Sequence, residues 1–112
     1  MLLCFSTPIW TFKIDNYEKV NEEIFKFILD LKKQDPKGLK VSNYKGWHSS
    51  NFDLKSPAVS EFVNLISPNI KTVIDDMSWN METQIIRLSN MWAIINEKGG
   101  LNERHHHGNC AN

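Results

Sequence analysis

The chain has 112 residues, enough for one domain that buries about two-thirds of the surface its unfolded form would expose. Its 13 Lys plus Arg balance 13 Asp plus Glu, so no net charge attracts it to nucleic acid or to an anionic membrane. The two cysteines lie at opposite ends, no apolar run reaches the roughly twenty residues of a membrane span, and the first residues lack a basic leader region. We therefore expect a cytoplasmic protein with no disulfide framework, no membrane segment and no nucleic-acid partner.

The first third of the chain predicts a strand followed by a helix. Residues 5–14 are rich in β-favouring side chains, and we expect an extended segment there. From 16 to 33 the apolar residues recur at steps of three and four, which is typical of an amphipathic helix. Asp15 or Asn16 should cap this helix, and the sequence Gln34–Gly38 should end it because it contains proline and glycine.

The middle of the chain predicts a loop and a second helix. Residues 37–53 are polar, and we interpret Gly46–Ser50 as a loop pinned by a tryptophan. Ser56 and Pro57 form a typical helix start, and a second apolar stripe runs from Val59 to Met77. Pro68 lies inside that stripe and should kink the helix or split it in two, because proline lacks the amide hydrogen and its ring clashes with the preceding turn.

The last third predicts strands. After residue 80 the apolar period changes, and residues 84–88 and 90–96 resemble β-strands. Two glycines in the sequence Glu97–Gly100 favour a hairpin turn, after which 102–110 would form the returning strand.

Three consecutive histidines near the end of the chain suggest a metal site. Alternate side chains of a strand share one face, so His105 and His107 would project together while His106 points away. Neutral imidazole is the commonest protein ligand for transition metals. The plainer alternative is a run of solvated histidines that binds metal adventitiously.

Four segments resemble the 2-oxoglutarate and Fe(II)-dependent oxygenases of a group associated with phages and marine bacteria. They are Phe5–Trp10, Gly46–Ser50, Met91–Gly99 and His105–Cys110. The strongest element is the order Trp, Asn, Gly and then His-x-His, because it places an aromatic strand, a tight turn and a metal strand in sequence. The resemblance extends over essentially the whole chain.

This resemblance implies an α+β fold, in which a helical layer precedes a double-stranded β-helix, or jelly roll, with iron at one open end. His105 would be the first iron ligand and His107 the second, although most members carry Asp or Glu at the second place. Fe(II) and 2-oxoglutarate would be the cofactors of a hydroxylase, acting on a small molecule or peptide that the sequence does not identify.

In the domain organisation that follows, the chain is one incomplete domain over 1–112. Residues 1–80 would be a helical support region with an N-terminal strand, and 81–112 would be the first strands of the jelly-roll core. The distal histidine and the group that binds the far carboxylate of 2-oxoglutarate would lie on later strands. We therefore expect the chain to be a truncated, N-terminal portion of an oxygenase that is inactive alone. A homo-oligomer is possible.

Two other functional classes compete with the oxygenase. A non-enzymatic metal-binding or interaction module needs no third ligand. A ββα-metal nuclease is suggested faintly by His106–Asn109, where one histidine would be a general base and the other a metal ligand. The balanced charge offers the nuclease no phosphate-seeking surface.

A few further side chains have both a functional and a structural interpretation. Trp92 and Asn96 could line a cofactor pocket, or be a core residue and a turn cap. His48 could reach a substrate entrance, although a lone loop histidine is usually a surface group. The other candidates are two arginines that could bind a carboxylate and a cysteine that we expect to be packed, namely Arg87, Arg104 and Cys110.

Overall fold

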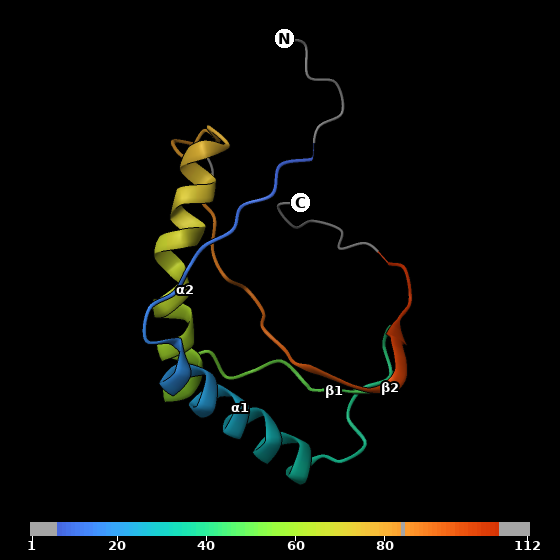
Figure 1. Ribbon diagram of the computed structural model, residues 1–112. Helices are drawn as coiled ribbons and strands as arrows, with labels where there is room; N and C mark the ends of the chain where they lie inside the picture. The colour runs from blue at the N-terminus through green and yellow to red at the C-terminus, as the bar shows by residue number, and fades with distance from the viewer. Residues whose placement is uncertain (1–6, 84, 106–112) are drawn as a thin grey trace.

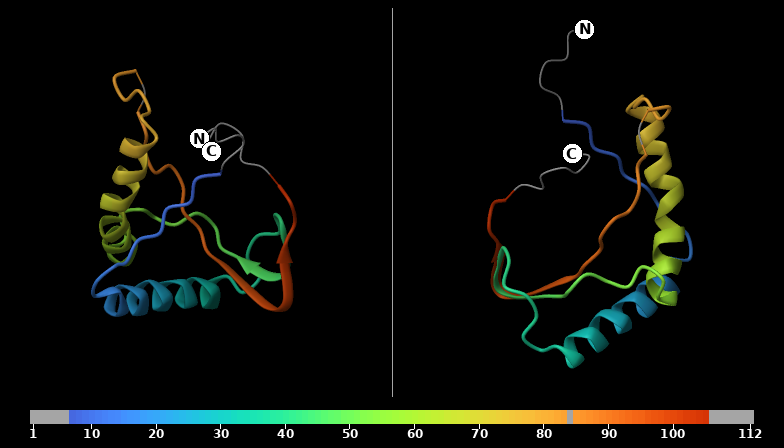
Figure 2. Two further views of the ribbon diagram at one scale, coloured as in Figure 1. Left: turned by 45° about the horizontal axis from the view of Figure 1, so that its top comes forward. Right: turned by 180° about the vertical axis from the view of Figure 1, so that it is seen from behind.

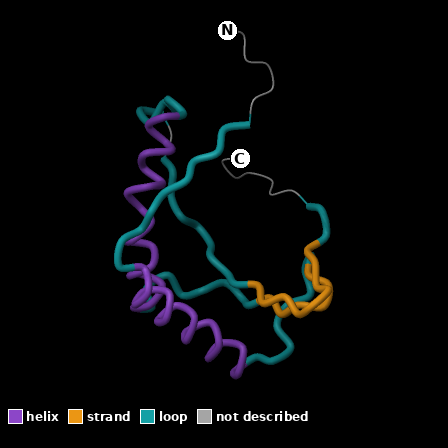
Figure 3. The backbone as a smooth tube through the Cα atoms, in the orientation of Figure 1, coloured by secondary structure: helices purple, strands orange, loops and turns teal. Residues whose placement is uncertain are grey.

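The computed structural model describes residues 7–83 and 85–105 and has an α+β architecture (Figure 1). Within these ranges, two helices and one two-stranded antiparallel sheet alternate along the chain (Figure 3). In chain order they are α1 (Tyr17–Gln34), β1 (Asn43–His48), α2 (Pro57–Asp76) and β2 (Ile94–Asn102). The predicted α+β class is confirmed.

Helix α1 confirms the amphipathic helix predicted over 16–33. Asn16 occupies the N-cap position, but its backbone is left-handed (φ 55°, ψ 33°) and its side chain makes no capping hydrogen bond. The predicted position of the N-cap is therefore confirmed, but the Asn16 side chain makes no capping hydrogen bond. At the other end the backbone N–H of Asp35 donates to the carbonyl of Leu31, and Pro36 follows, where no further helical turn can form.

Helix α2 begins as predicted, with Ser56 at the N-cap and Pro57 in the first turn. The predicted split at Pro68 is wrong, since the helix continues to Asp76. Proline removes the hydrogen bond to the carbonyl of Asn64, but both residues are exposed, so water can replace the missing donor. The Ser67 hydroxyl also donates to the Val63 carbonyl at 2.6 Å.

The two helices meet near their N-terminal ends, at one corner of the molecule (Figure 1, Figure 2). Val20 of α1 and Val59 of α2 are buried there, and Val59 is fully inaccessible. Lys19 lies 3.6 Å from Glu23 on its own helix and 3.6 Å from Glu61 on α2, and the attraction of these carboxylates raises the pKa of Lys19. This corner is the small core that holds α2 against α1.

The sheet lies at the opposite end of α1 and pairs segments about fifty residues apart in the sequence. His48 lies opposite Ile94, and Asn43 lies opposite Asn102. The register shifts between Tyr44 and Gly46, so that Lys45 alone faces the four residues Glu97–Gly100. The predicted hairpin turn at these glycines is therefore wrong: the chain bulges there and continues as the same strand.

Three further predictions about loops and strands are wrong in the described residues. Residues 37–53 were predicted to be a loop but contain β1, whereas 7–14 and 85–88 were predicted to be strands and form no regular structure. Within 7–14 the Trp10 indole donates to the Asp76 carboxylate of α2 at 2.9 Å. Strands need a neighbour, and in the described part of the chain only 43–48 and 94–102 find one.

The molecule is more open than a typical chain of its length. Its radius of gyration is 16.7 Å, against about 13 Å for a compact domain of this size. Within the described residues, neither helix combines the length and the apolar character needed to cross a membrane.

Candidate functional site

The predicted metal site begins at His105, which is exposed and follows the end of β2 by three residues. Its Nδ1 lies 2.8 Å from the carbonyl oxygen of Glu103. A carbonyl oxygen only accepts, so Nδ1 carries a proton, and in the neutral ring this is the tautomer of many metal-binding histidines. The role of His105 as a metal ligand stays a prediction.

The strand that was expected to carry His105 and His107 is not formed over its described residues 103–105. His107 lies outside the described residues, as do His106 and Cys110. Across 7–83 and 85–105, no three His, Cys, Asp or Glu side chains gather closely enough to hold an ion. The described residues therefore do not by themselves fit an iron site.

The environment of His48 differs most from the one predicted from the sequence. It was predicted to be a surface group on a loop, but it lies on β1 and is only 8% exposed. Its Nδ1–H donates to the Ser49 carbonyl at 2.6 Å, and its ring stacks on Trp92 with centroids 5.9 Å apart and planes 15° apart. Since it faces Ile94, it sits at the end of the ladder away from Asn102, and the structure does not bring it to His105.

Trp92 and Asn96 both fall in the predicted strand 90–96, but only Asn96 lies in a strand of the structure. Trp92 precedes the start of β2 and stacks on His48, partly exposed. Asn96 lies opposite Gly46, and its side-chain oxygen occupies the place where a Cβ on that glycine would stand. A cofactor role for either residue stays a prediction, and their observed contacts are structural.

The two arginines that were considered as carboxylate ligands are exposed. Arg87 lies in the irregular segment before β2, and Arg104 follows the end of that strand. Long exposed side chains of this kind are commonly solvated. Their role therefore stays a prediction.

Ser49 follows β1 directly, connects it to the segment before β2 and is 1% exposed. Its backbone N–H donates to the Ala93 carbonyl at 3.0 Å, while its hydroxyl accepts from the Ala93 N–H at 3.0 Å and donates to the Ser50 carbonyl at 2.7 Å. The side chain therefore replaces a backbone carbonyl and extends the ladder by one pair. No signal in the sequence distinguishes Ser49 from its neighbour Ser50.

Replacing Ser49 with alanine should leave the Ala93 N–H without its acceptor and lower the free energy of unfolding by about 1–3 kcal/mol. The Ser50→Ala variant is the matched control, because Ser50 is exposed and contributes only its backbone carbonyl. Amide exchange measured by NMR should be faster at Ala93 in Ser49→Ala alone. Equal exchange in the two variants would contradict the role assigned to the hydroxyl.

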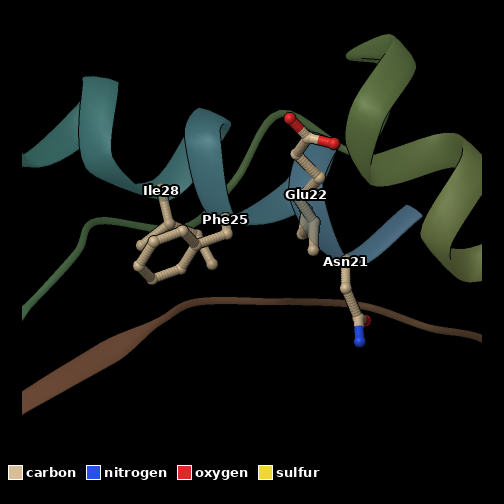
Figure 4. Close-up of a pocket in the computed structure, with 5 residues that line it drawn as sticks. Asn21, Glu22, Phe25 and Ile28 are labelled. Carbon is tan, nitrogen blue, oxygen red and sulfur yellow. The ribbon is translucent and has the colours of Figure 1, made fainter. Parts of the chain in front are cut away.

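The described surface has a shallow depression on α1. It is lined by Asn21, Glu22, Ile24, Phe25 and Ile28. Figure 4 shows Asn21, Phe25 and Ile28 pointing to one side of the helix, with Glu22 directed away from them. The depression therefore offers apolar contact and lacks converging catalytic groups.

Comparison of the chain with protein-family models, with curated proteins and with solved structures found no match.

Proposed function

We propose that this chain is the N-terminal portion of a 2-oxoglutarate and Fe(II)-dependent dioxygenase. In this proposal α1 and α2 support the first strands of a jelly roll, and His105 and His107 are two of the iron ligands. The observation that carries it is the His105 imidazole, exposed just after β2 with Nδ1–H held by the Glu103 carbonyl. The His-x-His spacing and the aromatic segment before it support the same proposal.

Two imidazoles alone should hold a divalent ion weakly, because a stable non-haem iron site uses a third protein ligand. We expect metal bound to this chain to exchange readily with solvent. The substrate class remains a small molecule or peptide, and the two widely separated cysteines favour the cytoplasm. The balanced charge favours a partner other than nucleic acid.

The proposal is tested by titrating the 112-residue chain with Fe(II) under anaerobic conditions, with and without 2-oxoglutarate. His105→Ala and His107→Ala should each weaken binding by about tenfold or more, whereas the matched control His106→Ala should change it little. Addition of 2-oxoglutarate should tighten binding in the wild type. An equal loss in all three variants would indicate an adventitious histidine run and contradict the assigned pair.

A non-enzymatic interaction module is the second candidate, and the exposed apolar side chains favour it. Phe25 is 59% exposed and lines the depression on α1 together with Ile24 and Ile28. A monomeric soluble protein rarely exposes contiguous apolar surface without a binding role. Folded chain that binds neither Fe(II) nor 2-oxoglutarate would favour this candidate, and zinc-dependent DNA binding would instead favour the nuclease.

A further inference from the structure

The two outer edges of the sheet differ in how their backbone groups are satisfied. On β1 the outward carbonyl of His48 accepts from the Leu39 N–H at 2.8 Å, and that of Gly46 accepts from the Asn43 side chain at 2.8 Å. The preceding loop and a side chain of β1 itself therefore satisfy these two carbonyls. Strand β2 lies along the margin of the molecule (Figure 1, Figure 2).

The alternation of an antiparallel ladder identifies which groups β2 presents outward. Ser49 donates to Ala93, so Trp47 and Ile95, two residues further along each strand, form the next hydrogen-bonded pair. Ile94 and Asn96 must then direct their N–H and C=O groups away from β1. We call these groups the outer edge of β2, and no residue within 7–83 and 85–105 hydrogen-bonds to them.

The accessible surface of the molecule is large enough to supply an interface. It amounts to 9589 Å², whereas a compact monomer of 13.0 kDa would expose about 6,300 Å². A stable dimer covers about 800 Å² on each partner, which is less than the difference between these two areas, taken over the whole molecule. Exposed apolar side chains continue from the outer edge into the preceding segment, at Trp92 and Leu88.

The charge pattern fits a second copy of the same chain. The formal net charge is zero, so two copies do not repel each other at long range. Natural sheet edges are commonly protected by lysine or proline, but the straight part of this edge, Ala93–Asn96, contains neither and has no charged residue. Two such segments can lie antiparallel without placing like charges opposite each other. The bulge at Glu97–Gly100 limits the pairing to this short stretch.

We propose that the outer edge of β2 binds the same edge of a second copy, about a two-fold axis that passes beside Ile94. Ile94 of each copy then exchanges two backbone hydrogen bonds with Ile94 of the other, and the two sheets become one of four antiparallel strands. This inference does not depend on a metal site. It assigns a homodimer interface to the strand that precedes the histidines.

The test is the mass of the whole chain in solution, measured by sedimentation equilibrium over a broad range of concentration. Wild type should be dimeric, and Ile94→Lys or Ile94→Glu should each weaken dimerisation by about tenfold or more, because like charges then meet at the axis. An equimolar mixture of the two variants should restore the dimer. Leu101→Lys is the matched control, because Leu101 is an exposed β2 residue beyond the bulge.

Circular dichroism of each variant separates loss of pairing from loss of folding. If charge at residue 94 unfolds the chain, Asn96→Pro replaces it, because that proline removes an outward N–H and no hydrogen bond between β1 and β2, and it should also weaken the dimer. A wild-type chain that is monomeric throughout the range would overturn the proposal. So would a dimer that tolerates every edge variant but is broken by Phe25→Lys on α1.

Discussion

Replacing Trp47 with alanine is expected to lower the free energy of unfolding by about 3–5 kcal/mol, the largest effect of any single truncation considered for this chain. The indole is 5% exposed, and its Nε1–H donates to the Asp35 carbonyl at 2.8 Å, at the C-terminal end of α1. The ring also packs against Gly38. Trp47 thus connects α1 to the sheet, and its loss would leave a cavity and an unpaired carbonyl at that junction.

The measurement is urea unfolding followed by far-UV circular dichroism. Tyr44→Ala is the matched control, because Tyr44 is an aromatic residue of the same strand that is 54% exposed, and its loss should change stability by about 0.5 kcal/mol or less. Trp47→Phe keeps most of the ring and removes the donor, so it should fall between the two. A Trp47→Ala variant no less stable than Tyr44→Ala would show that this junction does not hold the fold.

Replacing Gly38 with alanine should cost about 2–4 kcal/mol, because two unfavourable effects add at this position. The backbone is left-handed (φ +58°), where an L side chain is strained. A Cβ would also collide with the His48 carbonyl and lie 2.7 Å from the Trp47 ring. Neither the carbonyl, which accepts from the Leu39 N–H, nor the packed indole can move without disturbing this edge of β1.

Gly99→Ala separates these two effects. Gly99 is also left-handed (φ +79°), but no atom lies within 4 Å of the place where its Cβ would stand. Its replacement should therefore cost only the backbone strain, about 1–2 kcal/mol. Equal losses in the two glycine variants, measured by the same urea titration, would mean that the contact of Gly38 with β1 has no energetic weight.

Local patterns predicted both helices because a helix satisfies its hydrogen bonds within one segment. The spacing of apolar residues located α1, and Ser56 followed by Pro57 located the start of α2. The split that was one of the two outcomes predicted for Pro68 is wrong, since whether a missing helical hydrogen bond disrupts a helix depends on whether the site faces water. That exposure is a property of the folded molecule.

Pairing partners explain why the strands were predicted less well than the helices. Residues 43–48 looked like a polar loop because Gly46 and Ser49 are turn formers, yet they pair with 94–102. Conversely, the glycines of Glu97–Gly100 looked like a hairpin turn but form a bulge opposite Lys45. Composition shows which residues tolerate an extended backbone, and only the partner decides which of them form a strand.

The candidate site divides in the same way. The sequence alone determined the balance of charge, the two amphipathic helices and the His-x-His spacing, because these depend on residue type and on short-range order. Only the tertiary structure decided that His48 is buried against Trp92, that Ser49 extends the ladder and that no residue of 7–83 or 85–105 pairs with the outer edge of β2. Those outcomes required contacts between segments more than forty residues apart, which no local pattern encodes.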